Sequence, residues 1–112
     1  MAKVVIFAFK GEPSCFNHAL LNTLDMNSRG LEARLIIEGE ATRLVKNLEE
    51  RNHPLYIRAK EKGLIDGICR ACSQQMGALE FNETVGIPLL SDMSGHPPMS
   101  PYVEQGYQVM IL

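Results

Sequence analysis

The chain has 112 residues, of which 46% are hydrophobic and 21% are charged, and its net charge at pH 7 is -2. These values are typical of a globular protein and exclude a disordered or fibrous one, and the length predicts a single domain over residues 1–112. The lysines and arginines are scattered among acidic residues. The sequence therefore gives no electrostatic case for nucleic acid or an anionic membrane as a partner.

The first predicted element is a buried strand over residues 4–9, an apolar run that ends at Lys10 and Gly11. This run is too short to span a bilayer, and no small-residue cleavage site follows it, so we expect a cytoplasmic protein without a membrane partner. Pro13 then begins an amphipathic helix that Gly30 ends.

The next segments continue an alternation of strands and helices. A mostly buried strand over residues 34–37 is followed by a helix over residues 41–48 and by a short helix that Gly63 caps. A third strand covers residues 64–68 and leads into the sequence Cys69-Arg70-Ala71-Cys72, after which we expect a helix over residues 73–81. A short strand over residues 86–90, a loop over residues 91–98, a short helix from Pro101 and a fifth strand over residues 107–112 complete the chain.

Strands separated by helices predict an α/β protein with a flavodoxin-like, doubly wound and mostly parallel five-stranded sheet that has helices on both faces. The segments that follow the first, third and fourth strands then emerge at the carboxyl edge of the sheet, where such folds bind and react. We expect this edge to bring together all three cysteines and two of the three histidines, namely Cys15, His18, Cys69, Cys72 and His96.

The C-x-x-C of Cys69 and Cys72 indicates thiolate chemistry. A thiol at the junction of a strand and a helix meets unpaired N–H groups and the positive end of the helix dipole, which favour the thiolate. Three cysteines are an odd number in a chain without a secretory signal, which disfavours a disulfide framework and favours redox chemistry or metal binding.

The whole-chain layout resembles the DsrE/DsrF-like family of small cytoplasmic sulfur-handling proteins. The resemblance rests on Phe9-Lys10-Gly11-Glu12-Pro13 at the start of the first helix and on Asp66-Gly67-Ile68-Cys69-Arg70-Ala71-Cys72 ahead of a later one. It implies a doubly wound subunit that forms trimers or hexamers, and a sulfurtransferase-like carrier that exchanges persulfide sulfur with donor and acceptor proteins. By position the carrier cysteine would be Cys72, with Cys69 as second choice, and a simple carrier would have one reactive cysteine rather than two.

In the sulfur-relay hypothesis the Cys72 thiolate takes the outer sulfur of a donor persulfide and passes it to an acceptor thiol. Cys69 or Cys15 would resolve the persulfide, and His96, in a loop stiffened by two prolines, is the best candidate for an acid or base. In the alternative reading each of these residues is structural: the cysteines are small core residues and His96 is a turn residue. His18 is then a partly exposed helical residue and His53 a loop residue.

Two alternatives of other classes remain open. Cys69 and Cys72 have the spacing that lets both sulfurs reach one ion, and Cys15 with His96 or His18 would complete a tetrahedral site for zinc or for a softer redox metal. The apolar residues 109–112 instead suit an edge strand of a non-catalytic interaction subunit that associates with other copies. The sequence names no other cofactor, since it has no glycine-rich nucleotide-binding motif.

Overall fold

The structure is a computed structural model that describes residues 2–112. Its centre is a five-stranded, all-parallel sheet in the order β4-β3-β2-β1-β5. The strands are β1 (Lys3–Ala8), β2 (Glu32–Ile37), β3 (Ile65–Cys69), β4 (Leu89–Leu90) and β5 (Gln108–Ile111). This arrangement confirms the predicted α/β fold. From β1, the strands β2, β3 and β4 follow one another on one side of the sheet, and β5 lies on the other side of β1, so the strand order reverses its direction there.

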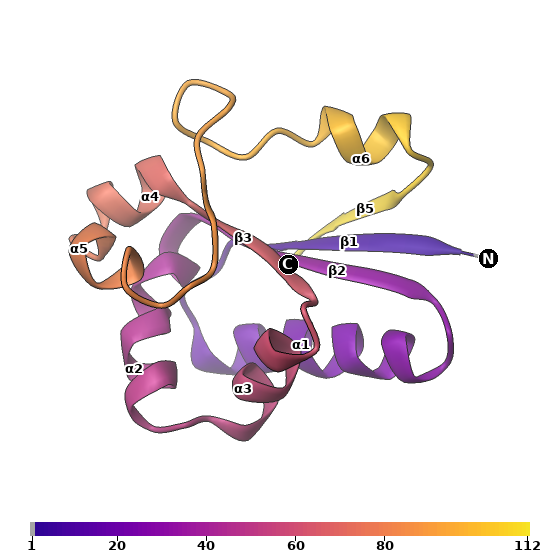
Figure 1. Cartoon of the computed structure of the whole chain (residues 1–112), viewed down its shortest axis with the longest axis horizontal. Coiled ribbons are helices and arrows are strands. Elements are labelled where there is room, and N and C mark those ends of the chain that lie inside the picture. Colours follow the sequence, from indigo (N-terminus) through magenta and orange to yellow (C-terminus); the bar gives the residue numbers. More distant parts are fainter. Residues whose placement is uncertain (1) are drawn as a thin grey trace.

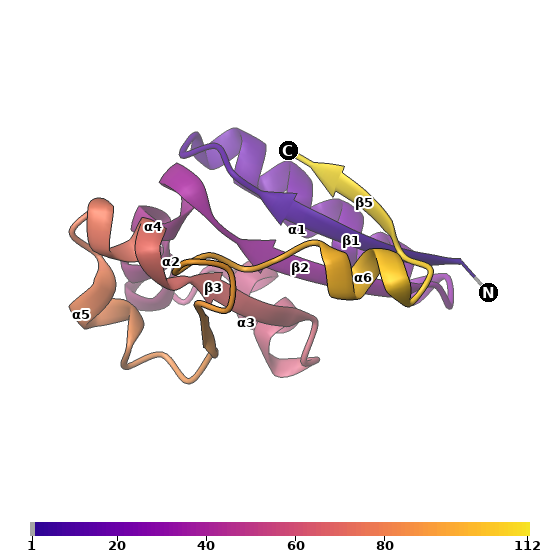
Figure 2. The same ribbon diagram turned by 90° about the horizontal axis from the view of Figure 1, so that it is seen from above.

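The helices cover the two faces of the sheet unequally. Helices α1, α2 and α3 lie on one face, whereas the short helix α6 lies over the other, as two perpendicular views show (Figures 1 and 2). The helical elements are α1 (Pro13–Ser28), the 3-10 helix η1 (Gly39–Leu44), α2 (Val45–Glu50), α3 (Pro54–Glu61), α4 (Arg70–Gln75), α5 (Leu79–Asn82) and α6 (Ser100–Glu104).

The core follows this unequal covering. Against α1 and α3, the sheet buries a large cluster that includes Leu35, Ile37, Phe16 and Leu20. Each fully buried side chain of this size contributes about 1.5 to 3 kcal/mol to folding, so this face supplies most of the hydrophobic stabilisation. On the other face the buried cluster is small and consists of Val5, Phe7 and Ile36, with partly buried aromatic and aliphatic residues packed against it.

Three predicted elements differ from those of the structure. The helix expected over residues 73–81 is two short helices, because the chain turns at Gly77 with a φ of 70°, a value that favours glycine. The strand expected over residues 86–90 pairs only at Leu89 and Leu90, and the helix expected over residues 41–48 begins as the 3-10 helix η1. The first of these differences matters for the site, since α4 begins at Arg70 and contains Cys72 in its first turn.

Among the described residues, none of the helices has both the length and the apolar character needed to cross a membrane.

Candidate functional site

Cys69 and Cys72 lie at the junction of β3 and α4. Cys69 is the last residue of β3 and the N-cap of α4, and its sulfur accepts a hydrogen bond from the backbone N–H of Cys72 at 3.3 Å. A cap of this kind satisfies one of the free donors at the start of a helix. The chain therefore turns sharply between the two cysteines, and both thiols are buried, with exposed fractions of 0% for Cys69 and 6% for Cys72.

His96 reaches these thiols from the loop after β4. The loop makes a tight turn in which Ser94 and Gly95 have positive φ values, and Met93 and His96 pair with each other across it. The Gly95 carbonyl accepts a hydrogen bond of 2.8 Å from the backbone N–H of Ala71 in the first turn of α4. The turn is thereby fixed to α4, which places the His96 ring against the C-x-x-C.

The three side chains form one compact group. The His96 Nδ1 atom lies 3.2 Å from the Cys69 sulfur and 3.6 Å from the Cys72 sulfur. All three potential ligand atoms lie within 4.8 Å of one another. The structure thus confirms that Cys69, Cys72 and His96 meet at the carboxyl edge of the sheet, and the group is suited to hold a metal ion.

Burial determines the protonation of the innermost thiol. Removal from water, with a further contribution from the neighbouring Cys72, raises the pKa of Cys69 to about 12. Without a bound cation, Cys69 is a neutral thiol at pH 7, and it is a poor nucleophile in that state. A metal ion that takes the place of the proton would remove this penalty.

Glu38 adds a negative charge near the group. It follows β2 at the same edge, is half-buried, and receives no hydrogen bond or ion pair at its carboxylate within residues 2–112. Burial raises the pKa of Glu38, and the positive charge that His96 can carry acts against this rise. A cation at the site would therefore be stabilised by Glu38 as well as by its own ligands.

A buried polar chain supports the site from behind, and sequence reasoning missed it. The Ser73 hydroxyl donates to the Cys69 carbonyl at 2.7 Å, and the Asn82 side-chain amide donates to the Ser73 oxygen and to the Thr42 carbonyl, both at 3.0 Å. Ser73, Asn82 and Thr42 are fully buried. The chain ties the end of β3 to α5 and η1, and no periodicity in the sequence indicates such a contact.

The structure does not assemble the predicted four-residue metal set, because Cys15 lies elsewhere. Cys15 and the exposed His18 are on α1, and within residues 2–112 the group of ligand atoms around Cys69 does not include them. β2 lies between β1 and β3, and since neighbouring strands are about 4.8 Å apart, the ends of β1 and β3 are separated by roughly 10 Å. Thiols that follow these two strands emerge at one edge of the sheet without meeting there.

Cys15 and His18 belong instead to a cavity at the carboxyl ends of β1 and β5, between the first turns of α1 and the end of β5. This cavity has a volume of about 340 Å³ and is lined by Lys10, Ser14, Cys15, His18, Ile111 and Leu112. The sequence predicted a single crevice at this edge. The structure instead has two separate features there, the group of Cys69, Cys72 and His96 and the cavity lined by Cys15 and His18.

Two other residues near the motifs of the sequence have structural roles. His53 caps α3, where its Nδ1 atom accepts a hydrogen bond of 3.4 Å from the backbone N–H of Tyr56. Arg70, between the two cysteines, is exposed and forms an ion pair of 3.6 Å with Glu83.

Comparison with known proteins finds one solved structure with a similar fold and two similar sequences, and none of these proteins has a stated activity. No family model matches the chain. The solved structure of BT1422, a conserved protein of unknown function from Bacteroides thetaiotaomicron, is similar, with a TM-score of 0.73 and 17% sequence identity over 98% of this chain and 95% of that chain. At this identity the likeness shows the fold alone.

Two archaeal sequences are similar. An uncharacterized protein of Archaeoglobus fulgidus is 50% identical over 40 residues, which cover 36% of this chain and 66% of that protein. The uncharacterized protein MJ0733 of Methanocaldococcus jannaschii is 30% identical over 113 residues, which cover 96% of this chain and 92% of that protein. Because this second match extends over nearly the whole of both chains, the chain belongs to the family of MJ0733.

Proposed function

We propose that the protein binds a thiophilic metal ion, with zinc as the first candidate, through Cys69, Cys72 and His96. The observation that carries this proposal is the meeting of two cysteine sulfurs and an imidazole nitrogen within 4.8 Å. Zinc bonds of about 2.3 Å to sulfur and 2.0 to 2.1 Å to nitrogen imply separations, in a tetrahedron, of roughly 3.5 to 3.6 Å between nitrogen and sulfur and roughly 3.8 Å between the two sulfurs. The distances from His96 Nδ1 to the two sulfurs, 3.2 and 3.6 Å, are close to this range.

The donor set also limits the chemistry of the metal. Two thiolates and one imidazole are soft to borderline ligands that favour zinc or copper(I) over magnesium or calcium. Three protein ligands leave one tetrahedral position for water, a substrate or a fourth ligand from another molecule, which is the arrangement of reactive rather than purely structural zinc sites.

Metal content tests the proposal directly. Protein purified without oxygen and loaded with zinc is expected to retain one zinc per chain after dialysis, measured by elemental mass spectrometry. Replacing one ligand, in Cys72→Ser or His96→Ala, should lower zinc affinity at least tenfold. Cys15→Ser is the matched control, since Cys15 lies outside the group, and it should bind zinc like the wild type. Equal loss in Cys15→Ser, or no retained zinc in the wild type, would contradict the proposal.

Sulfur transfer is the second candidate, and the relative exposure of the two thiols favours it. Cys72 is the less buried of the pair, and its sulfur lies 3.6 Å from the His96 nitrogen, which can accept the thiol proton. This geometry is in keeping with the resemblance to DsrE/DsrF-like sulfur-relay proteins, on which trimers or hexamers and protein donors and acceptors of sulfur are also proposed.

The transfer step needs no outside oxidant. The Cys72 thiolate attacks the outer sulfur of a donor persulfide, so that one S–S bond breaks as another forms, and the proton held by His96 passes to the departing thiolate. Once His96, whose Nδ1 atom lies 3.2 Å away, has taken the Cys69 proton, the Cys69 sulfur attacks the inner sulfur of the new persulfide, which forms a Cys69–Cys72 disulfide and releases hydrogen sulfide.

Mass spectrometry distinguishes the two functions. Metal-free protein treated with a low-molecular-weight persulfide should gain the mass of whole sulfur atoms on Cys72 if it is a carrier, and Cys72→Ser should gain none there. A chain that binds zinc with tenfold or more dependence on His96 and takes up no sulfur on Cys72 would leave only the metal function.

A further inference from the structure

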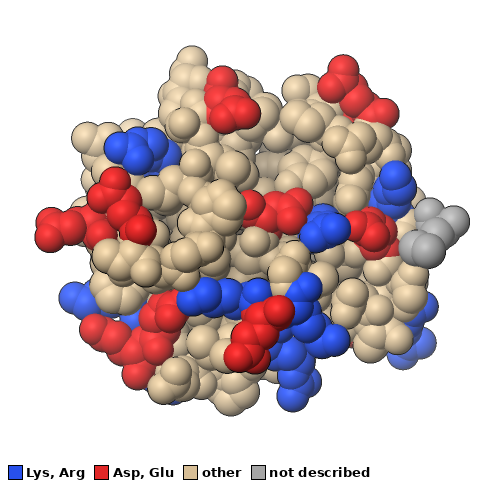
Figure 3. Space-filling model, in the orientation of Figure 1, with Lys and Arg blue, Asp and Glu red and all other residues tan. Residues whose placement is uncertain are grey.

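A cavity on the sparsely covered face of the sheet is separate from the cysteine site. It has a volume of about 400 Å³ and lies between α6, the loop after β4, and the strands β2 and β3. On this face of the molecule, Figure 3 shows a hollow between two raised lobes, with acidic and basic groups alternating across the surface below it. The size is within the range of cavities that hold small molecules.

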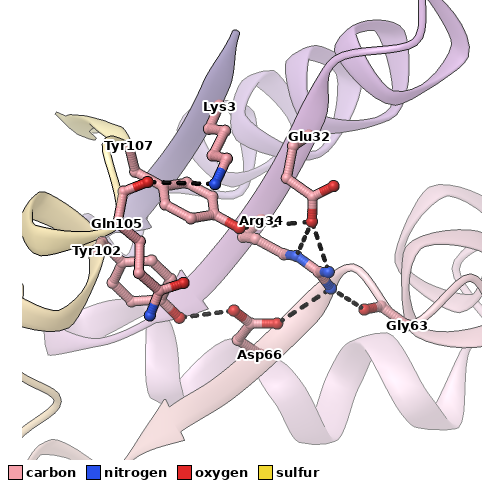
Figure 4. A network of polar contacts seen from close by, with 8 residues as sticks. All are labelled: Lys3, Glu32, Arg34, Gly63, Asp66, Tyr102, Gln105 and Tyr107. Atoms are coloured by element: carbon pink, nitrogen blue, oxygen red, sulfur yellow. Dashed lines mark hydrogen bonds and ion pairs between the residues drawn. The ribbon is translucent and has the colours of Figure 1, made fainter. Parts of the chain in front are cut away.

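The floor of the cavity contains an arginine whose charge is already compensated. The Arg34 guanidinium donates to Glu32 at 2.7 Å, to Asp66 at 3.4 Å and to the Gly63 carbonyl at 3.0 Å (Figure 4). Most of its N–H groups are therefore used within the protein. A carboxylate or phosphate ligand would have to compete with two carboxylates for this cation.

Two tyrosines that line the cavity, Tyr102 and Tyr107, extend this network, and their hydroxyl oxygens can accept hydrogen bonds from a ligand. The Tyr102 hydroxyl donates to Asp66 at 2.6 Å and the Tyr107 hydroxyl donates to Glu32 at 3.4 Å (Figure 4). Burial and the hydrogen bond to Asp66 raise the pKa of Tyr102, so this hydroxyl keeps its proton at neutral pH. Because each proton is committed to a carboxylate, each phenolic oxygen has only lone pairs left to offer.

The walls of the cavity add a free acid and apolar surface. Asp92, on the loop after β4, is exposed and forms no ion pair within residues 2–112. Leu90, Pro98 and Pro101 line the cavity as well. With one positive side chain, Arg34, and two negative ones, Asp66 and Asp92, the lining has an excess of one negative charge.

We propose that this cavity binds a small primary alkylammonium compound. Its N–H groups would meet the acceptors of Asp92, Asp66 and the tyrosines, and its short alkyl stem would pack against Leu90 and the prolines. An ammonium group has three donors and no acceptor, which is the complement of a lining rich in acceptors. The cavity is distinct from the thiol group, so this proposal does not depend on the metal or sulfur function.

The test uses n-butylammonium and butanoate as probes of matched size and opposite charge, with amide chemical shifts of the full chain as the readout. The ammonium is expected to cause saturable shifts confined to β2, β3, the loop after β4, α6 and Tyr107, whereas butanoate should cause none. Asp92→Asn should weaken binding about tenfold, the loss expected when one charge-assisted hydrogen bond is weakened.

Glu104→Gln is the matched control, because it removes the same charge from α6 at an exposed residue that does not line the cavity. Glu104→Gln and Cys72→Ser should both bind like the wild type. An equal loss in Glu104→Gln would show general surface attraction, and equal shifts with butanoate or no saturable shifts with the ammonium would likewise overturn the proposal.

Discussion

Glu38 has a half-buried carboxylate whose charge interacts with His96 and with the Cys69 thiol. Burial raises its pKa in the folded state, so the folded chain holds this proton at pH values where the unfolded chain has released it. The resulting contribution to stability is present at low pH and is lost as the pH rises through the unfolded and then the folded pKa. In metal-free protein, Glu38→Gln is therefore expected to be more stable than the wild type at pH 8 and equal to it at pH 3.5, in urea unfolding. A difference that grows toward low pH would contradict this assignment.

Ser73 is the residue on which the buried support of the site depends. Its hydroxyl donates to the Cys69 carbonyl and accepts from the Asn82 amide, so Ser73→Ala removes both hydrogen bonds and leaves one buried N–H of Asn82 without an acceptor. We expect a loss of about 1 to 3 kcal/mol in the free energy of unfolding, together with weaker zinc binding because the end of β3 is less firmly held. Ser28→Ala is the matched control, since the Ser28 hydroxyl is exposed and donates to the nearby carbonyl of Asp25, and it should change stability by less than about 0.5 kcal/mol.

At the scale of elements, the loop after β4 completes the candidate site, because it places His96 beside Cys69 and Cys72. Gly95 has a φ of 93°, and a Cβ atom there would lie 3.0 Å from the Cβ of Ala71. Gly95→Ala should cost about 1 to 2 kcal/mol for the backbone conformation alone, and the contact with Ala71 should also push His96 away from the thiols. Zinc affinity is therefore expected to fall.

Gly86→Ala separates these two effects. Gly86 has a φ of 83°, but a Cβ atom there would have nothing within 4 Å. The Gly86→Ala variant should therefore lose about as much stability as Gly95→Ala but keep the zinc affinity of the wild type. If both variants lose zinc equally, the loop does not position His96 in the way described.

The same elements show how far the sequence could predict the site. The alternation of apolar runs and glycine stops predicts the strands and their parallel direction, and the C-x-x-C stands out because Cys69 and Cys72 are close along the chain. The separation of Cys15 from them depends on β2 lying between β1 and β3, which is a property of strand order and not of any local pattern. The contact of Asn82 with Ser73 likewise joins two helices through single hydrogen bonds, which no periodicity records.

For the whole molecule, the unequal covering of the sheet predicts where stability is low. The face under α1 and α3 buries the large cluster, while the loop after β4 and α6 rest on a small cluster and on polar contacts. Regions with few buried apolar contacts open most easily, and their opening is measured by amide hydrogen exchange. We expect fast exchange in the loop after β4 and slow exchange in β1 and β2 in metal-free protein.

Zinc should change this pattern locally, because it would connect the end of β3 and the start of α4 to His96 on the loop. At a free zinc concentration of 100 times Kd, binding to the folded state adds about 2.7 kcal/mol to its stability. Protection is therefore expected to rise at residues 91–98 and in α4 through direct contact with the ion, whereas amides of α1 that exchange by global unfolding should gain only this increase in overall stability. His96→Ala should abolish the gain on the loop, because the loop then has no bond to the metal, whereas Cys15→Ser should retain it. Zinc-dependent protection of the loop that persists in His96→Ala would place the ion elsewhere.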